Sequence, residues 1–153
     1  ESCDRECTIV TNEGGMQKKG MFDILSKSKP AICDLKTTTV VGHDAYAALS
    51  FRLGYWISLG SYRAWHNQEC PSTQIEEVVQ FVLNVNPPYD LCVRPMDDQE
   101  LALGHKVQLN ACGTLKDAIK NERWGDSGNG MPVPLTFPRW AVPESMEMVE
   151  FGG

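Results

Sequence analysis

The 153-residue sequence lacks features that mark several large classes of protein. Its longest apolar stretch, residues 45–64, is interrupted by arginines, glycines and serines, whereas a membrane-spanning helix needs roughly 18 apolar residues in a row. Basic residues are also few: 14 Lys and Arg stand against 20 Asp and Glu, a net charge of −6, which is unfavourable for binding nucleic acid. We therefore expect a protein that neither spans a membrane nor binds nucleic acid.

The first quarter of the chain holds the only concentration of lysines, and acids are interspersed among them. We interpret this pattern as a solvated face rather than as a docking patch for an acidic partner. Its residues are Lys18, Lys19, Lys27, Lys29 and Lys36, with Asp23 and Asp34 among them.

The cysteines are even in number and include no CxxC pair of the zinc-ribbon kind. This pattern favours three disulfides in an oxidising compartment and leaves their pairing open. A zinc site that combines His66 with cysteines is the weaker alternative, because the spacings match zinc motifs poorly. We expect neither a metal nor another cofactor. The six cysteines are Cys3, Cys7, Cys33, Cys70, Cys92 and Cys112.

The sequence opens at "ESCDREC", with neither a Met nor an apolar leader. Such a start is typical of a mature chain from which a signal peptide has been removed. Together with the cysteines, it leads us to expect a secreted or periplasmic protein.

Apolar periodicity predicts a mainly α fold, with α+β as the alternative. One long amphipathic helix is expected over 44–64, with Gly54 and Gly60 allowing close approach of another element. A capping box formed by Thr73 and Glu76 predicts a second helix that ends before Pro87. Residues 94–112 fit a helix better than a strand, and the first forty residues are expected to be irregular. We predict a disulfide-linked helical domain over 1–125 and an extended proline-rich arm over 126–153.

No catalytic signature stands out from these elements. The adjacent acids at 76–77 and 97–98 have the positions of helix-start charges. The letters "GDSG" at 125–128 resemble a serine-protease loop, but the chain is too short for that fold. A cysteine nucleophile would need a spare thiol beside a histidine, which three disulfides would not leave.

The segment "LGYWISLGSYRAWHNQECPSTQIEEVVQFVLNVNP", residues 53–87, resembles small helical periplasmic immunity proteins of type VI amidase effectors. The likeness consists of a Gly-aromatic helix, a Cys-Pro at Cys70 and Pro71, and a Thr-started apolar helix that ends at Pro87. It implies a helical, disulfide-linked, non-enzymatic binder in the periplasm.

The sequence therefore predicts a non-enzymatic exported protein that binds another protein, as an assembly subunit or an inhibitor, or that self-associates through its arm. A small secreted hydrolase or toxin is the first alternative, which a concave pocket with two carboxylates would favour. A carbohydrate- or ligand-binding module that uses exposed aromatics is the second. The expected contact residues are Phe137, Arg139, Trp140, Met146, Met148 and Phe151 in the arm, and Trp65 and His66 if exposed at their corner.

Overall fold

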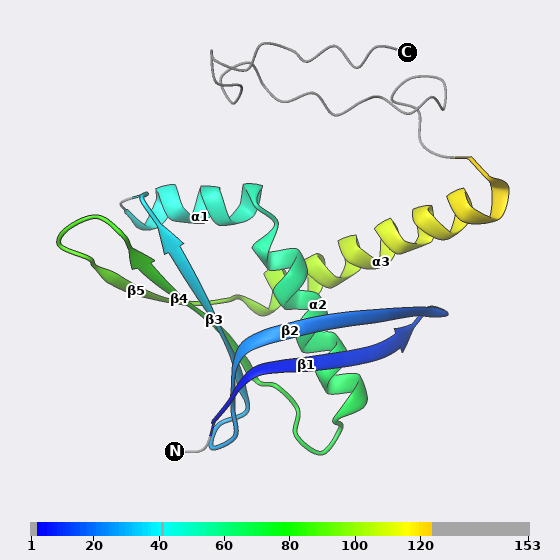
Figure 1. The fold of residues 1–153 in the computed structure, drawn as a ribbon, viewed down its shortest axis with the longest axis horizontal. Helices are drawn as coiled ribbons and strands as arrows, with labels where there is room; N and C mark the ends of the chain where they lie inside the picture. The colour runs from blue at the N-terminus through cyan, green and yellow to red at the C-terminus, as the bar shows by residue number, and fades with distance from the viewer. Residues whose placement is uncertain (1–2, 41, 124–153) are drawn as a thin grey trace, which may run out of the picture. The chain divides into compact units, whose positions relative to one another are not determined.

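The computed structural model describes residues 3–40 and 42–123. The chain divides into two units, residues 1–115 and 116–153, and the sheet and the candidate site belong to the first. The described chain forms five strands and three helices, whose arrangement in space is drawn in Figure 1. They are β1 (Cys3–Glu13), β2 (Met16–Ser26), β3 (Ala31–Thr38), α1 (His43–Arg52), α2 (Tyr55–Glu69), β4 (Glu77–Asn84), β5 (Leu91–Pro95) and α3 (Asp98–Asn121).

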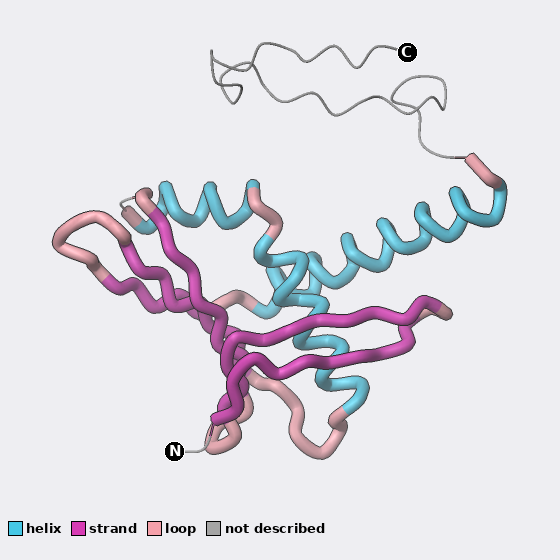
Figure 2. The backbone as a smooth tube through the Cα atoms, viewed as in Figure 1, coloured by secondary structure: helices cyan, strands magenta, loops and turns pink. Residues whose placement is uncertain are grey.

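The strands form one mixed sheet in the order β1-β2-β3-β4-β5. The pairs β1–β2, β2–β3 and β4–β5 are antiparallel, whereas β3 and β4 are parallel and are joined by the crossover through α1 and α2. Pairing of β2 with β3 covers only three residue pairs and stops at Ile24 and Cys33. Beyond that point the β1–β2 hairpin and β3 run apart, as Figure 2 shows.

The core lies between the sheet and helix α2. Ile32 of β3, Val78 of β4, Leu59 of α2 and Leu101 of α3 are almost completely buried. In β4 the buried residues alternate strictly with more exposed ones, which is the period of a strand with one face on the core. The sheet and α2 therefore form one framework.

Glycines determine how the helices meet. Gly54 has a φ of 72°, in the left-handed region, and it separates α1 from α2 where one continuous helix had been predicted. A side chain on Gly60 would collide with the backbone of Leu101, and one on Gly104 with that of Trp56. The prediction of a close approach at Gly60 is therefore confirmed.

The predicted fold class is wrong, because the protein is not mainly helical. The N-terminal forty residues, expected to be irregular, form three strands, and the predicted helix after Thr73 is strand β4. The periodicity of residues 75–83 misled the prediction, because a strand with one face buried and the other half-buried also shows closely spaced apolar residues. The helix expected over 94–112 is confirmed as α3.

The predicted disulfides are also contradicted: all six cysteines are free. They are spread over β1, β3, β5, α3 and the end of α2, so the even count alone was misleading. The arm at 126–153 lies outside the described residues. Within the described parts of the chain, no helix is both long and apolar enough to cross a membrane.

Candidate active site

The divergence of β2 from β3 opens a pocket that α2 closes from one side. The cavity measures about 260 Å³. It brings together two acids and a lysine from neighbouring strands, with aromatic and hydroxyl groups from the helix. The lining residues are Met21, Asp23, Asp34, Lys36, Tyr55, Ser58, Leu59 and Tyr62.

Asp23 of β2 precedes Ile24, which with Cys33 of β3 forms the last residue pair before the two strands diverge. Its Oδ2 accepts a hydrogen bond of 2.7 Å from the backbone N–H of Leu35. This N–H has no strand partner on β2, so the Asp23 carboxylate satisfies a donor that the diverging strands leave unpaired. The bond fixes Asp23 beside the Asp34–Lys36 segment of β3.

Asp34 and Lys36 project from the same face of β3, because residues two apart in a strand point the same way. Lys36 Nζ donates to Asp34 Oδ1 at 2.6 Å and lies 4.9 Å from the centre of the Tyr55 ring. The side chains of Asp34 and Lys36 are only 13% and 23% exposed, so this ion pair is shielded from solvent more than an ordinary surface pair. The lysine is thereby held against the acid.

The second oxygen of Asp34 is held by Gln80 of β4, its register neighbour in the parallel pair. Gln80 is completely buried, and its Nε2 donates to Asp34 Oδ2 at 3.3 Å. Arg94 of β5 donates to Gln80 Oε1 at 3.2 Å and binds both oxygens of Glu100 at 3.0 and 3.1 Å. Because the Arg94 guanidinium can only donate hydrogen bonds, it pairs with the oxygen of the Gln80 amide, and the Nε2 end of that amide is left to face Asp34.

The two carboxylates suit a hard divalent cation. Mg²⁺ prefers oxygen ligands and is commonly held by one or two carboxylates together with waters and substrate phosphates. Asp23 Oδ1 makes no hydrogen bond within the described residues, so it is available as a ligand. No group of three or more His, Cys, Asp or Glu that could hold a metal occurs within residues 3–40 and 42–123. Because both donors are carboxylates, they fit Mg²⁺ or Mn²⁺ rather than structural zinc, which takes cysteine and histidine ligands.

The residues predicted from sequence lie elsewhere. Trp65 and His66 are each 5% exposed, so they do not form the exposed corner that their predicted contact role required. Burial lowers the pKa of His66, with an opposing contribution from the hydrogen bond to Asn67. The six predicted contact residues of the arm, from Phe137 to Phe151, lie outside the described residues.

The sequence interpretation missed the acids that the structure brings together. Asp23 and Asp34 stood among the lysines that were assigned to a solvated face. The sequence did contain a signal: ten residues separate Asp23 from Asp34, which begins an Asp-x-Lys pattern, "D-ILSKSKPAIC-DLK". That spacing is what a short hairpin between two adjacent antiparallel strands requires to bring both acids to its open end.

Comparison with known proteins supports the fold. No family model and no curated protein matches the sequence. The solved structure of a proposed exonuclease from Eubacterium rectale is similar, with a TM-score of 0.61 and 16% identity over 80% of this chain and 47% of that one. This chain thus spans about half of that protein. A second solved structure, that of SSO0001, has a TM-score of 0.45 and 13% identity over 71% of this chain and 50% of that one.

These findings correct the prediction of a non-enzymatic helical binder. That prediction depended on a disulfide-linked helical domain, whereas the chain has a mixed sheet like that of a proposed exonuclease and six free cysteines. The criterion that would favour a hydrolase, a concave pocket with two carboxylates, is met by Asp23 and Asp34.

Proposed function

We propose that the chain carries the active site of a metal-dependent phosphodiester hydrolase that acts on nucleic acid. The observation that supports this most directly is the juxtaposition of Asp23, Asp34 and Lys36 in one pocket at the divergence of two strands. The likeness to a proposed exonuclease is compatible with it, although at 16% identity it concerns the fold alone.

Asp23 and Asp34 would hold the metal ion, which lowers the pKa of a bound water and neutralises charge on the phosphate. Lys36 places a positive charge beside Asp34, where it orients the attacking water or stabilises the charge that develops on the phosphate. Gln80 is a positioning residue, because it holds Asp34 Oδ2 and is itself held by Arg94. Tyr55 confines the Lys36 ammonium through its ring face.

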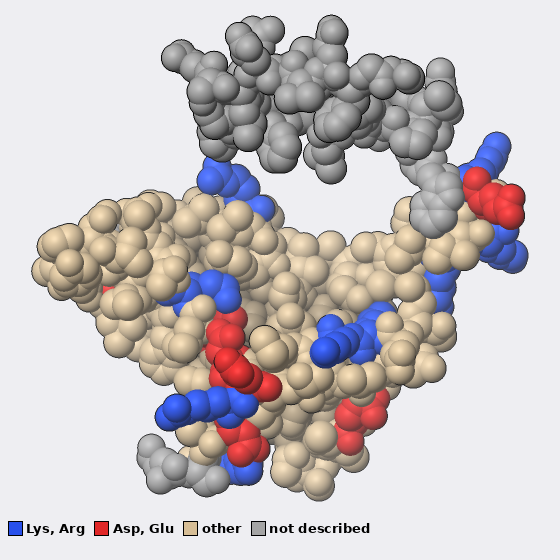
Figure 3. All heavy atoms as spheres, viewed as in Figure 1, with Lys and Arg blue, Asp and Glu red and all other residues tan. Residues whose placement is uncertain are grey.

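The acidic net charge had led us to expect no nucleic acid, and the proposed function departs from that expectation. Acidic and basic side chains are mixed on the face seen in Figure 3, without an extended area of one sign. Four of the five N-terminal lysines are paired with acids: Lys18, Lys27, Lys29 and Lys36. Phosphate binding would therefore depend on the metal and on local cations in the pocket more than on a broad basic surface.

The test is cleavage of labelled single-stranded and double-stranded DNA and RNA in Mg²⁺ or Mn²⁺, with EDTA as the metal-free control. We expect Asp34→Asn and Lys36→Met to lower the rate by more than about 100-fold, because even the outer partners of metal ligands are worth about 10- to 100-fold. Glu76→Gln is the matched control, because Glu76 is exposed and its side chain makes no hydrogen bond within the described residues.

Circular dichroism would show that each variant is folded. The proposal is wrong if the folded protein cleaves none of these polynucleotides in either metal. It is equally wrong if Asp34→Asn retains the activity of the Glu76→Gln control.

A further inference from the structure

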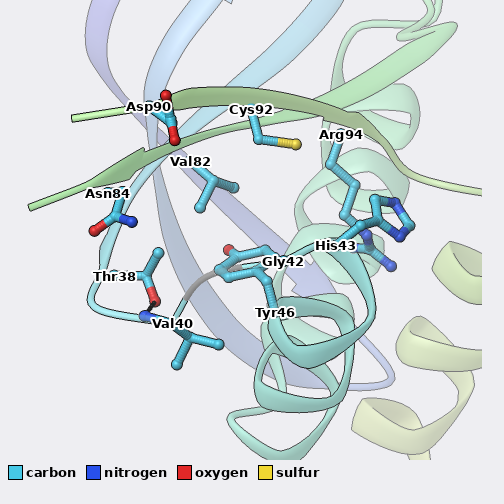
Figure 4. Close-up of a pocket in the computed structure, with 10 residues that line it drawn as sticks. All are labelled: Thr38, Val40, Gly42, His43, Tyr46, Val82, Asn84, Asp90, Cys92 and Arg94. Carbon is cyan, nitrogen blue, oxygen red and sulfur yellow. Dashed lines mark hydrogen bonds between the residues drawn. The ribbon is translucent and has the colours of Figure 1, made fainter. Parts of the chain in front are cut away.

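A second cavity, of about 180 Å³, lies between α1 and the strands β3, β4 and β5. Figure 4 shows Tyr46 reaching from α1 into the middle of the residues that line it, with Val82 of β4 beyond the ring. The surface of the wall is mainly apolar, although most of the residues that line it also carry a polar side-chain atom. The lining residues include Thr38, Tyr46, Val82, Asp90, Cys92 and Arg94.

This cavity adjoins the candidate active site along two strands. Thr38 is two residues beyond Lys36 on β3, and Val82 is two residues beyond Gln80 on β4, so both pairs share a face. Two residues of strand span about 6.6 Å, which is within reach of a single nucleotide. Arg94 also links the two sites, because it lines the cavity and holds Gln80, the partner of Asp34.

The Tyr46 hydroxyl is the unusual feature of the cavity. Tyr46 is 6% exposed, and its hydroxyl is buried without a hydrogen-bond partner in the described residues. Burial, followed by the charges of Tyr55 and Asp34, raises the pKa of Tyr46 to about 12, so the hydroxyl keeps its proton. Buried polar groups nearly always have a partner, and a bound molecule would supply the missing one.

The charges at the cavity favour a neutral ring over a phosphate. Arg94 is already bound to both oxygens of Glu100 and to Gln80, and so it is not free to neutralise an anion. The carboxylate of Asp90 lines the same cavity and would repel one. In contrast, an aspartate can accept from an N–H of a neutral base, such as N3–H of thymine.

We propose that this cavity receives one nucleobase of the substrate, from the nucleotide next to the phosphate held at Asp23 and Asp34. The inference rests on the proposed function. A cavity of about 150 Å³ is enough for a benzene ring, so one of this size admits a single six-membered ring, as in a pyrimidine. The Tyr46 hydroxyl would donate to the edge of that ring.

Cys92 permits a test that does not require catalysis. It is exposed, its thiol is free, and it lines the cavity, whereas Cys3 is exposed at the start of β1 and serves as an internal reference. Alkylation of both would be followed by peptide mass spectrometry with Ca²⁺ in place of Mg²⁺ as the oxygen-preferring divalent cation. It would be measured with a single-stranded oligothymidylate and with an oligomer of the same length made of abasic nucleotides. Fluorescence anisotropy would measure the binding of each oligomer.

We expect oligothymidylate at ten times its Kd to slow alkylation of Cys92 by about tenfold, in proportion to the occupied fraction. Cys3 should be unaffected, and the abasic oligomer should protect neither thiol. Binding of oligothymidylate without protection of Cys92 would refute the base site alone. Failure of both oligomers to bind at concentrations up to about 1 mM, which is above the roughly 10⁻⁴ M upper end of non-specific protein–nucleic acid Kd values, would refute both this inference and the proposed function.

Tyr46→Phe separates ligand binding from folding. Removing an unpartnered hydroxyl should leave the melting temperature unchanged or raise it. The affinity for oligothymidylate should fall by about 3- to 10-fold, the effect of one neutral hydrogen bond, whereas the affinity for the abasic oligomer should not change. An equal effect on both oligomers would show that the hydroxyl does not contact a base.

Discussion

The carboxylate of Glu13, at the end of β1, contacts residues of both α2 and α3, and its substitution tests how strongly the β1–β2 hairpin is held to the helices. Glu13 Oε2 accepts from Lys18 Nζ at 2.6 Å and from Trp65 Nε1 at 3.1 Å. Its other oxygen lies 2.6 Å from His105 Nε2 on α3. Thus one side chain near the tip of the hairpin connects it to α2 and α3.

Glu13→Gln keeps the size of the side chain but removes its charge. The side chains of Lys18 and Glu13 are only 6% and 13% exposed, so the substitution leaves a nearly buried ammonium without its counter-ion. Breaking a buried pair in this way costs about 3–5 kcal/mol, and glutamine retains one acceptor oxygen. We expect the free energy of unfolding to fall by about 3 kcal/mol.

Glu77→Gln is the matched control, because the Lys29–Glu77 pair has the same chemistry but its side chains are 62% and 48% exposed. Solvent screens such a pair, so its loss should have little effect on stability. Urea denaturation at pH 7, followed by tryptophan fluorescence, would measure both variants. If the two substitutions destabilise the protein equally, the Glu13 contacts do not hold the hairpin.

The effect of Glu13 should depend on pH in a definite direction. Burial alone would raise the pKa of Glu13, but the hydrogen bonds from Lys18, Trp65 and His105 outweigh it, so its pKa is below the ordinary value of 4.5. A group whose pKa is lower in the folded than in the unfolded state stabilises the fold at pH values above its unfolded-state pKa. That stabilisation is lost as the pH falls through its folded-state pKa. The difference in the free energy of unfolding between wild type and Glu13→Gln should therefore be largest above about pH 5 and should decrease below it.

Two further substitutions test the packing of the helices and the support of the active site. Gly60→Ala should lower the free energy of unfolding by more than about 2 kcal/mol, because its Cβ would collide with the Leu101 carbonyl. Gly113→Ala is the control, because the space around its Cβ is open, and it should be neutral or stabilising in the same urea titration. Arg94→Lys keeps the charge, but lysine cannot bind Glu100 and Gln80 together. We expect kcat for polynucleotide cleavage to fall by about 10-fold and the metal concentration needed for half-maximal activity to rise. Unchanged kinetics in the folded variant would show that Arg94 does not position Asp34.

The sequence predicted those parts of the fold in which local chemistry agrees with tertiary structure. Helix α3 begins after Asp97, whose carboxylate accepts from the backbone of Gln99, and acids fill its first turn. Such signals act within one turn of chain and need no distant partner. The small residue at Gly60 likewise indicated a close contact, although not that its partner is Leu101 on α3.

Strand β4 could not be recognised locally, because two competing signals pointed to a helix. Thr73 and Glu76 form the sequence pattern of a capping box, and Val78, Val79 and Val82 fit a helical stripe. In the structure, β4 lies between β3 and β5, so pairing on both sides outweighs these signals. The β-branched valines were the clue that favoured a strand.

The candidate active site depends on the same kind of distant information. Ten residues separate Asp23 from Asp34, a spacing compatible with a hairpin, but the residues beside each acid do not indicate that the two strands diverge there. The two acids meet because pairing between β2 and β3 ends at Ile24 and Cys33, which leaves each as the next residue on a diverging strand. The unpaired N–H of Leu35 then takes the Asp23 carboxylate in place of a β2 carbonyl.

This arrangement links the stability of the sheet to the chemistry of the pocket. If β2 continued to pair with β3, the Leu35 N–H would bond to the backbone of β2, and the space that the pocket occupies would be closed by strand. The divergence leaves backbone groups unpaired, and the Asp23 carboxylate and helix α2 offset that loss. The acid that would bind the metal is therefore also the acid that stabilises the open end of the strand pair, so its substitution should affect folding and activity together.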